Sequence, residues 1–370
     1  MPAYKKLCFL ICVSLILSVV SLNVGALSLS AESAILIDAD SGEILYGRNP
    51  QSKMAMASTT KIMSAVVAIE NMSLDTKVKI PDEAVGIEGS SIYLCKGEIL
   101  TLEELLYALL LASANDAATA IAIAVGGSVE GFADMMNETA KRLGLNDTHF
   151  ENPHGLDGKA HYTTAEDLAR LTSYALTLPQ FRQIVSTYKK SISFDGNKDG
   201  RLVVNHNKLL RSYNGTIGVK TGFTKKSGRC LVSAAERNGV TLIAVTLNAP
   251  NDWNDHTILL NYGFDNYEAI TLGEFCVDMP VISGKRATVC CAAKEKKTIL
   301  LPKERGNIEM VVEMYPFIYA PVSKDEALGE VVYYLDGREI ARIEVSATET
   351  VELAKQKCIV WDNFFNKIKD

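Results

Sequence analysis

The chain has 370 residues, 48% of them hydrophobic and 22% charged, and its formal net charge at pH 7 is -6. This length and composition are typical of a globular protein with one large and one small domain. The acidic balance argues against a protein that binds nucleic acid through a basic surface, so we expect no nucleic-acid partner.

The first 26 residues have the pattern of a secretory signal peptide. Lys5 and Lys6 precede an apolar run over residues 7–20, and Val24-Gly25-Ala26 supplies the small residues typical of a cleavage site. We therefore expect a signal over residues 1–26 and a mature chain that starts near Leu27. A retained membrane anchor is the alternative, but the apolar run is short for a membrane span.

A serine and a lysine three residues apart, Ser58 and Lys61, stand immediately before an apolar run over residues 62–69. The run predicts a buried helix, and residues three apart on a helix share a face, so Lys61 can reach Ser58. Burial and neighbouring cations lower the pKa of a lysine, which makes Lys61 the candidate base that activates the nucleophile Ser58. The backbone N–H of Ser58 is a candidate oxyanion donor.

The same spacing also has an ordinary structural interpretation, an N-cap serine followed by a lysine whose amino group reaches solvent. Ser186 and Lys189 form a second pair of this kind, and such pairs arise easily by chance. The weight of the first pair therefore depends on two segments that follow it in the chain.

The first of these segments is Ser113-Ala114-Asn115, between predicted helices over residues 102–111 and 116–125. A connection of this kind can be exposed at a cleft. Ser113 would then relay a proton to a leaving amine, and the Asn115 amide would donate to and accept from a peptide substrate. The alternative is a helix cap, because Ser, Asn and Asp are all favoured there.

The second segment, Lys220-Thr221-Gly222, falls within a predicted strand over residues 218–224. Strands over residues 231–235 and 240–247 follow, joined by a turn at Asn238-Gly239, which is a strong hairpin signal. We expect the strand over residues 218–224 to form an edge of the sheet that faces the same cleft.

Each residue of this edge has a candidate role in binding substrate. Lys220 adds positive charge near Lys61 and a substrate carboxylate, while Gly222 lets a substrate backbone approach closely. Thr221 and Thr224 offer hydroxyls to the carboxylate, and the backbone N–H of Phe223 is the second candidate oxyanion donor. The alternative is a solvated strand with a surface lysine.

Three histidines, His149, His154 and His161, raise a metal site as an alternative. Their spacing fits no tight helical ligand pair, so we expect no metal and no cofactor. Six cysteines follow the predicted signal, two of them adjacent as Cys290-Cys291. This spacing does not resemble a disulfide framework, and we expect mostly free thiols.

The chain changes character after Tyr262-Gly263-Phe264. Short apolar or alternating runs, such as residues 308–314, 331–335 and 340–345, predict a small all-β domain over residues 273–352. Its role is open between a spacer, which we favour, and a partner-binding module.

The last residues, 353–370, predict an amphipathic helix, because Trp361, Phe364, Phe365 and Ile368 recur at helical spacing. Such a helix can lie in a membrane interface, and we favour the membrane surface as its partner. The alternative is a helix that packs on the β domain.

Together the three motifs resemble those of D-alanyl-D-alanine carboxypeptidases, the serine-type penicillin-binding proteins of low molecular weight. Residues 34–42, 152–156 and 161–169 strengthen the resemblance, which extends over residues 30–272. It implies a mixed α and β (α+β) fold of the β-lactamase and transpeptidase type over residues 27–272, with an antiparallel sheet between helical layers.

The resemblance also implies a reaction, the removal of the terminal D-alanine from peptidoglycan pentapeptide stems. Ser58 would form the acyl-enzyme, with Lys61 as base and Ser113 in proton relay, and β-lactam antibiotics would acylate the same serine. The residues that would hold the substrate are Asn115, Lys220, Thr221, Gly222, Phe223 and Thr224. With the signal and the terminal helix, we expect an exported protein at the outer face of the cytoplasmic membrane.

Two departures leave the recognition of the substrate carboxylate open. Phe223 stands where some relatives carry histidine, and Thr241 stands near a position where some carry arginine.

Three rival functions share the general fold. A β-lactamase is disfavoured because no convincing Glu-x-x-x-Asn segment lies between the second and third motifs. A serine glutaminase would not need a signal peptide. A non-catalytic protein that only holds cell-wall peptide is disfavoured because every catalytic position is filled.

Overall fold

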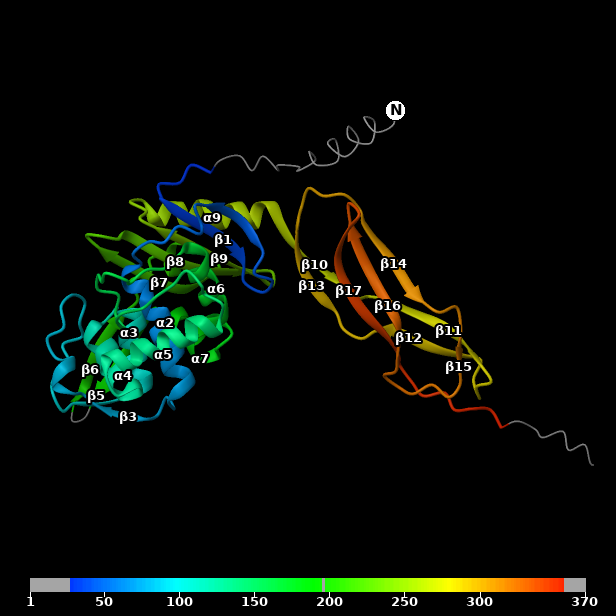
Figure 1. Ribbon diagram of the computed structural model, residues 1–370, viewed down its shortest axis with the longest axis horizontal. Helices are drawn as coiled ribbons and strands as arrows, with labels where there is room; N and C mark the ends of the chain where they lie inside the picture. Colours follow the sequence, from blue (N-terminus) through cyan, green and yellow to red (C-terminus); the bar gives the residue numbers. More distant parts are fainter. Residues whose placement is uncertain (1–26, 195–196, 356–370) are drawn as a thin grey trace, which may run out of the picture. The chain divides into compact units, whose positions relative to one another are not determined.

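The computed structural model describes residues 27–194 and 197–355, which form two compact units (Figure 1). The first unit runs to Gly263 without Asn238–Val240, and the second consists of those three residues and the chain from Phe264 onward. The predicted signal over residues 1–26 lies outside the described residues, as do residues 356–370 of the predicted terminal helix.

A five-stranded sheet with the order β2-β1-β9-β8-β7 forms the centre of the first unit. All residues of the central strands β1 and β9 are buried, as in strands covered on both faces. The predicted hairpin is confirmed as β8 and β9, and β7 lies at the edge of the sheet as predicted. The five strands are β1 (Ser33–Asp38), β2 (Ile44–Arg48), β7 (Thr216–Thr224), β8 (Gly228–Arg237) and β9 (Val240–Leu247).

Helices cover both faces of this sheet. On one face α9 packs through His256, whose Nε2 lies 3.0 Å from the hydroxyl of Thr246 on β9. On the other face α6 forms a hydrogen bond to the residue that follows β1: the Ser173 hydroxyl donates to the Ala39 carbonyl over 2.6 Å. Figure 1 shows α2 to α7 together on that side. The helices are η1 (Ala57–Thr60), α2 (Lys61–Asn71), α3 (Leu102–Leu111), α4 (Asn115–Gly126), α5 (Val129–Arg142), α6 (Ala165–Leu176), α7 (Pro179–Ser186), α8 (Leu209–Ser212) and α9 (Asp252–Asn266).

The layered architecture confirms the predicted antiparallel sheet between helical layers. The predicted helix over residues 102–111 matches α3, and the helix predicted over 116–125 is α4. Two small hairpins and a 3-10 turn complete this unit: β3 (Lys77–Lys79) with β4 (Ile99–Thr101), β5 (Lys189–Phe194) with β6 (Asn197–Val204), and η2 (Asp82–Ala84).

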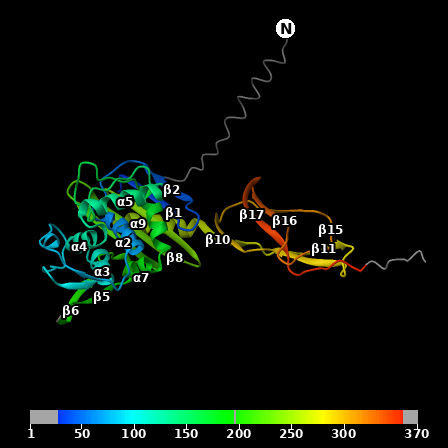
Figure 2. The same ribbon diagram turned by 60° about the horizontal axis from the view of Figure 1, so that its bottom comes forward.

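The second unit is built from strands, which confirms the predicted small all-β domain. Six strands have the order β14-β16-β17-β12-β11-β15, and β10 pairs with β13. Figure 2 shows β11 and β15 beside one another, and they pair in parallel. The strands are β10 (Tyr267–Leu272), β11 (Cys276–Ile282), β12 (Thr288–Ala293), β13 (Lys297–Pro302), β14 (Ile308–Met314), β15 (Ile318–Tyr319), β16 (Ala327–Leu335) and β17 (Arg338–Ala347).

Two boundaries differ from the sequence prediction. The first unit ends at Gly263 and not at Leu272, because β10 pairs with β13 inside the second unit. Leu353 forms an antiparallel bridge with Gly284. Leu353 is therefore not part of a helix, although the predicted helix over residues 353–370 began there.

No helix within residues 27–194 and 197–355 is long and apolar enough to cross a membrane. The five cysteines in these ranges are free thiols, and the Sγ atoms of Cys276 and Cys290 lie 2.8 Å apart.

Candidate active site

Ser58 lies in the 3-10 turn η1, one turn before α2, and not at the first position of a regular helix. Ala57 before it has a left-handed backbone with φ of 48°, which is unusual for a residue other than glycine. Backbone of this kind, costing about 1–3 kcal/mol, concentrates at functional sites.

Two glycines let other segments pack against this turn. A Cβ added to Gly222 of β7 would lie 3.1 Å from the Ser58 nitrogen, and one added to Gly155 would lie 1.9 Å from the Ala57 carbonyl oxygen. Gly155 also has a φ of 88°. The structure therefore gives Gly222 a role in seating Ser58, the candidate nucleophile, beside its predicted role toward a substrate backbone.

Lys61, the first residue of α2, is fully buried and has three oxygen partners. Its Nζ lies 3.0 Å from Ser58 Oγ, 2.7 Å from Asn115 Oδ1 and 2.6 Å from the His154 carbonyl oxygen. The predicted Ser58–Lys61 pair is therefore formed. Burial, and next the charge of Lys220, hold the pKa of Lys61 well below its usual value, against an opposing contribution from Asp116.

The three oxygen partners accommodate both protonation states of Lys61, and its lowered pKa favours the neutral amine. A neutral lysine has two N–H donors and one lone pair. Protonated Lys61 can donate to all three oxygens. Once Lys61 is neutral, its two N–H groups can donate to Asn115 Oδ1 and the His154 carbonyl oxygen, and its lone pair accepts a hydrogen bond from the Ser58 hydroxyl. The arrangement therefore lets Lys61 take the proton of Ser58 as the bond to a substrate forms.

Lys220 on β7 is the second buried lysine of the site. Its Nζ donates to the Thr221 carbonyl over 2.8 Å, and burial lowers its pKa from 10.5 to about 7. Its charge is one cause of the lowered Lys61 pKa, so the two lysines influence one another's protonation.

Asn115 and Asp116 tie a loop to the site. The Asn115 amide donates to the Glu88 carbonyl over 2.5 Å, and its backbone N–H donates to the Ser90 carbonyl over 2.7 Å. Buried Asp116 accepts hydrogen bonds from the Ser91 hydroxyl and from the backbone N–H of Leu94, at 2.6 and 3.0 Å. The sequence did not single out Asp116, because an acidic residue in the first turn of a helix is usually interpreted as a helix cap.

The histidines hold the loop that follows α5. Glu151 N–H donates to His161 Nδ1 over 3.0 Å, so a neutral His161 carries its proton on Nε2, 2.7 Å from the Thr60 hydroxyl. Burial lowers the pKa of His161 to about 4 and that of His154 to about 3. Both rings are thus neutral at pH 7. His154 Nδ1 accepts from the backbone N–H of Leu156 over 3.2 Å within this loop, and the contact of its carbonyl oxygen with Lys61 was not foreseen.

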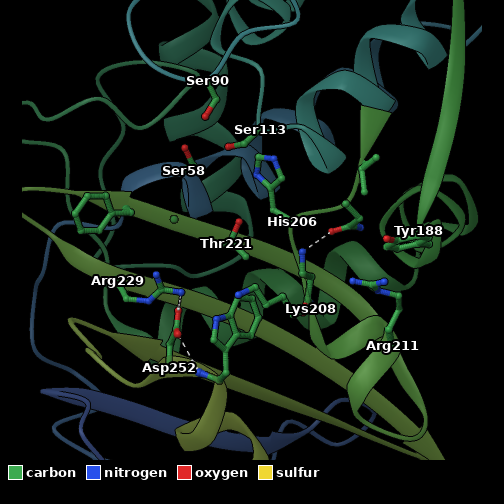
Figure 3. Close-up of a pocket in the computed structure, with 16 residues that line it drawn as sticks. Ser58, Ser90, Ser113, Tyr188, His206, Lys208, Arg211, Thr221, Arg229 and Asp252 are labelled. Carbon is green, nitrogen blue, oxygen red and sulfur yellow. Dashed lines mark hydrogen bonds and ion pairs between the residues drawn. The ribbon is translucent and has the colours of Figure 1, made fainter. Parts of the chain in front are cut away.

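A cleft of about 600 Å³ opens at Ser58 (Figure 3). Five predicted residues line it: Ser58, Ser113, Thr221, Gly222 and Phe223. Ser113 has a left-handed backbone with φ of 61°. The other lining residues are Ser90, Tyr188, Val204, Asn205, His206, Asn207, Lys208, Arg211, Arg229, Asp252 and Trp253.

Four predicted site residues are not in the cleft lining. Lys61, Asn115 and Lys220 lie buried behind it. The Thr224 hydroxyl bonds to Asp157 over 3.0 Å and to Ser227 over 2.9 Å. The structure thus places this hydroxyl in the β7–β8 turn and not in the cleft.

Arg229 on β8 is a cleft residue that the sequence analysis missed. It pairs with Asp252 over 2.9 Å, and its guanidinium carbon lies 5.8 Å from the centre of the Trp253 ring. Across the sheet it is the partner of Phe223. Arg229 stands seven positions after the Lys-Thr-Gly motif, and its place in the cleft becomes apparent only from this pairing.

Comparison with known proteins gives the family. Residues 21–251 match the family model described as D-alanyl-D-alanine carboxypeptidase, Peptidase S11. This match covers more than half of the chain. The chain belongs to the D-alanyl-D-alanine carboxypeptidase family. Residues 264–353 match the C-terminal domain of penicillin-binding protein 5, which begins where the second compact unit begins.

Relatives of this family extend over nearly the whole chain. D-alanyl-D-alanine carboxypeptidase DacF of Bacillus subtilis is 34% identical over 88% of this chain and 86% of its own length. DacC of Escherichia coli is 32% identical over 92% of this chain and 89% of its own. The structure of penicillin-binding protein 5 from Haemophilus influenzae has a TM-score of 0.72 at 28% identity, over 89% of this chain and 99% of its own.

As a member of the D-alanyl-D-alanine carboxypeptidase family, the chain is a serine-type hydrolase and a penicillin-binding protein. The three predicted motifs converge on one cleft of the catalytic unit. The site therefore offers a serine hydroxyl in contact with a buried amine of lowered pKa, the combination that nucleophilic catalysis by serine requires.

The lowered pKa of Lys220 predicts a stability change with pH. Between about pH 7 and 10.5 the unfolded chain holds a proton that folded Lys220 has released, so the free energy of unfolding rises with pH. Replacing Lys220 by methionine removes up to about 1.4 kcal/mol per pH unit from this rise. Urea unfolding at several pH values gives the free energy of unfolding of the wild-type and the Lys220→Met protein. If this free energy changed with pH in the same way in both proteins, Lys220 would have an ordinary pKa.

Proposed function

We propose that this chain removes the terminal D-alanine from peptidoglycan stem peptides through an acyl-enzyme on Ser58, and that penicillins acylate the same serine. The observation that carries the proposal is the 3.0 Å contact between Lys61 Nζ and Ser58 Oγ, in which the amine's other two partners are carbonyl oxygens. Family membership gives the class of reaction.

In the acylation step, Ser58 Oγ attacks the carbonyl carbon of the penultimate D-alanine while Lys61 accepts the hydroxyl proton. Negative charge develops on the carbonyl oxygen, which the backbone N–H groups of Ser58 and Phe223 would stabilise. Gly222 packs closely against the Ser58 nitrogen, and Phe223 is the next residue in the chain. This packing supports the proposal that the N–H groups of Ser58 and Phe223 act together.

The leaving amine then needs a proton as its bond to carbon breaks. Ser113 lines the cleft beside Ser58, and we assign it the relay of the proton from Lys61 to the amine. The carboxylate of the departing D-alanine would meet the Thr221 hydroxyl and the guanidinium of Arg229, and Lys220, buried behind the cleft, would act on it without contact. Water would then hydrolyse the ester, with Lys61 as base again.

Asn115 acts in this scheme chiefly through Lys61. Its Oδ1 accepts from Lys61 and one amide hydrogen is used by the Glu88 carbonyl, which leaves one hydrogen for a substrate. Substrate binding by Asn115 stays a prediction, as does substrate binding by Thr224.

Replacing Ser58 by alanine should abolish both benzylpenicillin labelling and D-alanine release, because no other group takes its place as nucleophile. Intact-mass analysis with benzylpenicillin, followed by D-alanine release from diacetyl-L-lysyl-D-alanyl-D-alanine, measures both. Ser186→Ala is the matched control, since Ser186 has the same spacing to a lysine but bonds to the Gln183 carbonyl at the end of α7. Labelling that persists in Ser58→Ala would contradict the proposal, and rapid penicillin turnover without peptide hydrolysis would indicate a β-lactamase.

We also propose a location for the protein, from the patterns of residues 1–26 and 361–370. The charged and apolar pattern of residues 1–26 supports export across the cytoplasmic membrane. The spacing of Trp361, Phe364, Phe365 and Ile368 supports an interfacial helix at the outer face of that membrane, where peptidoglycan is accessible.

Deleting residues 361–370 should move the exported protein from the membrane to the soluble fraction, because the deletion removes the apolar face of the predicted helix. Fractionation of cells followed by penicillin labelling measures the distribution. Replacing Lys367 and Lys369 by glutamine is a milder control that keeps this apolar face. Unchanged fractionation of the deletion variant would exclude membrane anchoring by this segment.

A further inference from the structure

The cleft continues beyond the catalytic residues. Figure 3 shows Ser58 and Ser113 toward one side and Tyr188 and Arg211 toward the other, with His206 and Thr221 between them. The Lys208 side chain runs back from Arg211, and its Nζ lies 6.0 Å from the centre of the Trp253 ring. All of these residues line the same cavity. The part formed by Asn207, Lys208 and Arg211, hereafter the far end, has no role in the scheme above.

The backbone of the far end is firmly held. Buried Asn205 donates from its side-chain amide to the carbonyls of Val185 and Thr187, over 3.1 and 3.2 Å. Its Oδ1 accepts from the backbone N–H of Asn207 over 2.9 Å, and Asn207 Oδ1 accepts from Leu209 N–H over 3.0 Å. These bonds fix the segment that presents the side chains of the far end.

One donor in this held segment is unused. Asn207 is 1% exposed, and its amide nitrogen Nδ2 has no hydrogen-bond partner within the described part of the chain. A buried donor without a partner costs free energy, and a ligand oxygen would satisfy it.

The far end is also positively charged. Neither Lys208 nor Arg211 forms an ion pair in the described ranges. The Arg211 guanidinium carbon lies 4.8 Å from the centre of the Tyr188 ring, which fixes the cation without neutralising it. In the described lining of the cleft the single carboxylate is Asp252, and Arg229 pairs with it.

The position of the far end assigns it to the leaving side of the scissile bond. The acyl part of a substrate must reach the oxyanion donors at Ser58 and Phe223, whereas the leaving amine must reach Ser113. Thr221 lies between Ser58 and the far end, and α8, which carries Arg211, packs against β7. A group bound at the far end therefore belongs to the leaving amino acid, past its own carboxylate.

We propose that Asn207 and Arg211 form a subsite for a second carboxylate carried by the leaving group, with Lys208 adding positive charge from the side of Trp253. The enzyme then hydrolyses a D-alanyl bond to an acidic leaving residue in preference to the neutral residue of the same shape. Bond making is unchanged: Ser58 Oγ bonds to the carbonyl carbon, the carbon–nitrogen bond breaks, and the amine leaves with the proton. This inference rests on the proposed function.

The test compares three peptides, diacetyl-L-lysyl-D-alanyl followed by D-alanine, D-glutamate or D-glutamine. D-Glutamate and D-glutamine have the same shape and differ in charge. We expect kcat/KM for the D-glutamate peptide to exceed that for the D-glutamine peptide by roughly five- to tenfold at low salt, and the excess to shrink as salt is added.

Substitutions at the far end test whether its cations cause the preference for the D-glutamate peptide. Because Lys208 and Arg211 are exposed, their replacement by alanine should not disturb folding, and the double variant should bring the D-glutamate to D-glutamine ratio close to one. Arg211→Glu should invert the preference. Lys141→Ala on α5, an exposed lysine outside the cleft lining, is the control and should keep the wild-type ratio.

The outcomes separate this inference from the proposed function. Release of D-alanine with equal kcat/KM for the acidic and neutral peptides, or with neither of them cleaved, overturns the subsite and leaves the proposed function in place. A ratio that survives the double variant also overturns it. Failure to hydrolyse any of the three peptides overturns the proposed function, and the subsite with it.

Discussion

The burial of Lys61 against Ser58 is the contact on which the catalytic unit depends. An ammonium group in this place has no carboxylate within its three contacts, which are a hydroxyl and two carbonyl oxygens. The low dielectric of the surroundings and the nearby Lys220 favour the neutral amine, and only that form can accept a proton. The fold thus makes a base out of a residue that is normally charged.

Several surrounding segments hold Lys61 in place beside Ser58. The Asn115 segment and the 152–156 loop each supply an oxygen to Lys61, and the loop requires Gly155 to approach the turn before Ser58. Two buried lysines in one site lower the stability of the folded chain, because burial penalises their charged forms. Such a cost is typical of sites built for function.

The sequence predicted the parts of the fold that depend on local pattern. The helix α3, the β8–β9 hairpin and the all-β second unit follow from periodicity and turn residues, which act over short stretches of chain. The Ser58–Lys61 contact was predicted from the spacing of three residues, which brings two side chains to one side of a 3-10 turn as it does on an α-helix. Arg229 could not be predicted, because its place in the cleft depends on pairing with Phe223 and Asp252.

The most direct test of the account is the pH dependence of Ser58 acylation by benzylpenicillin, measured as a second-order rate constant from pH 5 to 10. With Lys61 neutral at rest, the rate constant should stop rising with pH well below pH 10, because no further base forms there. A rate constant that keeps rising about tenfold per pH unit up to pH 10 would show that Lys61 is protonated at neutral pH, and would contradict the account.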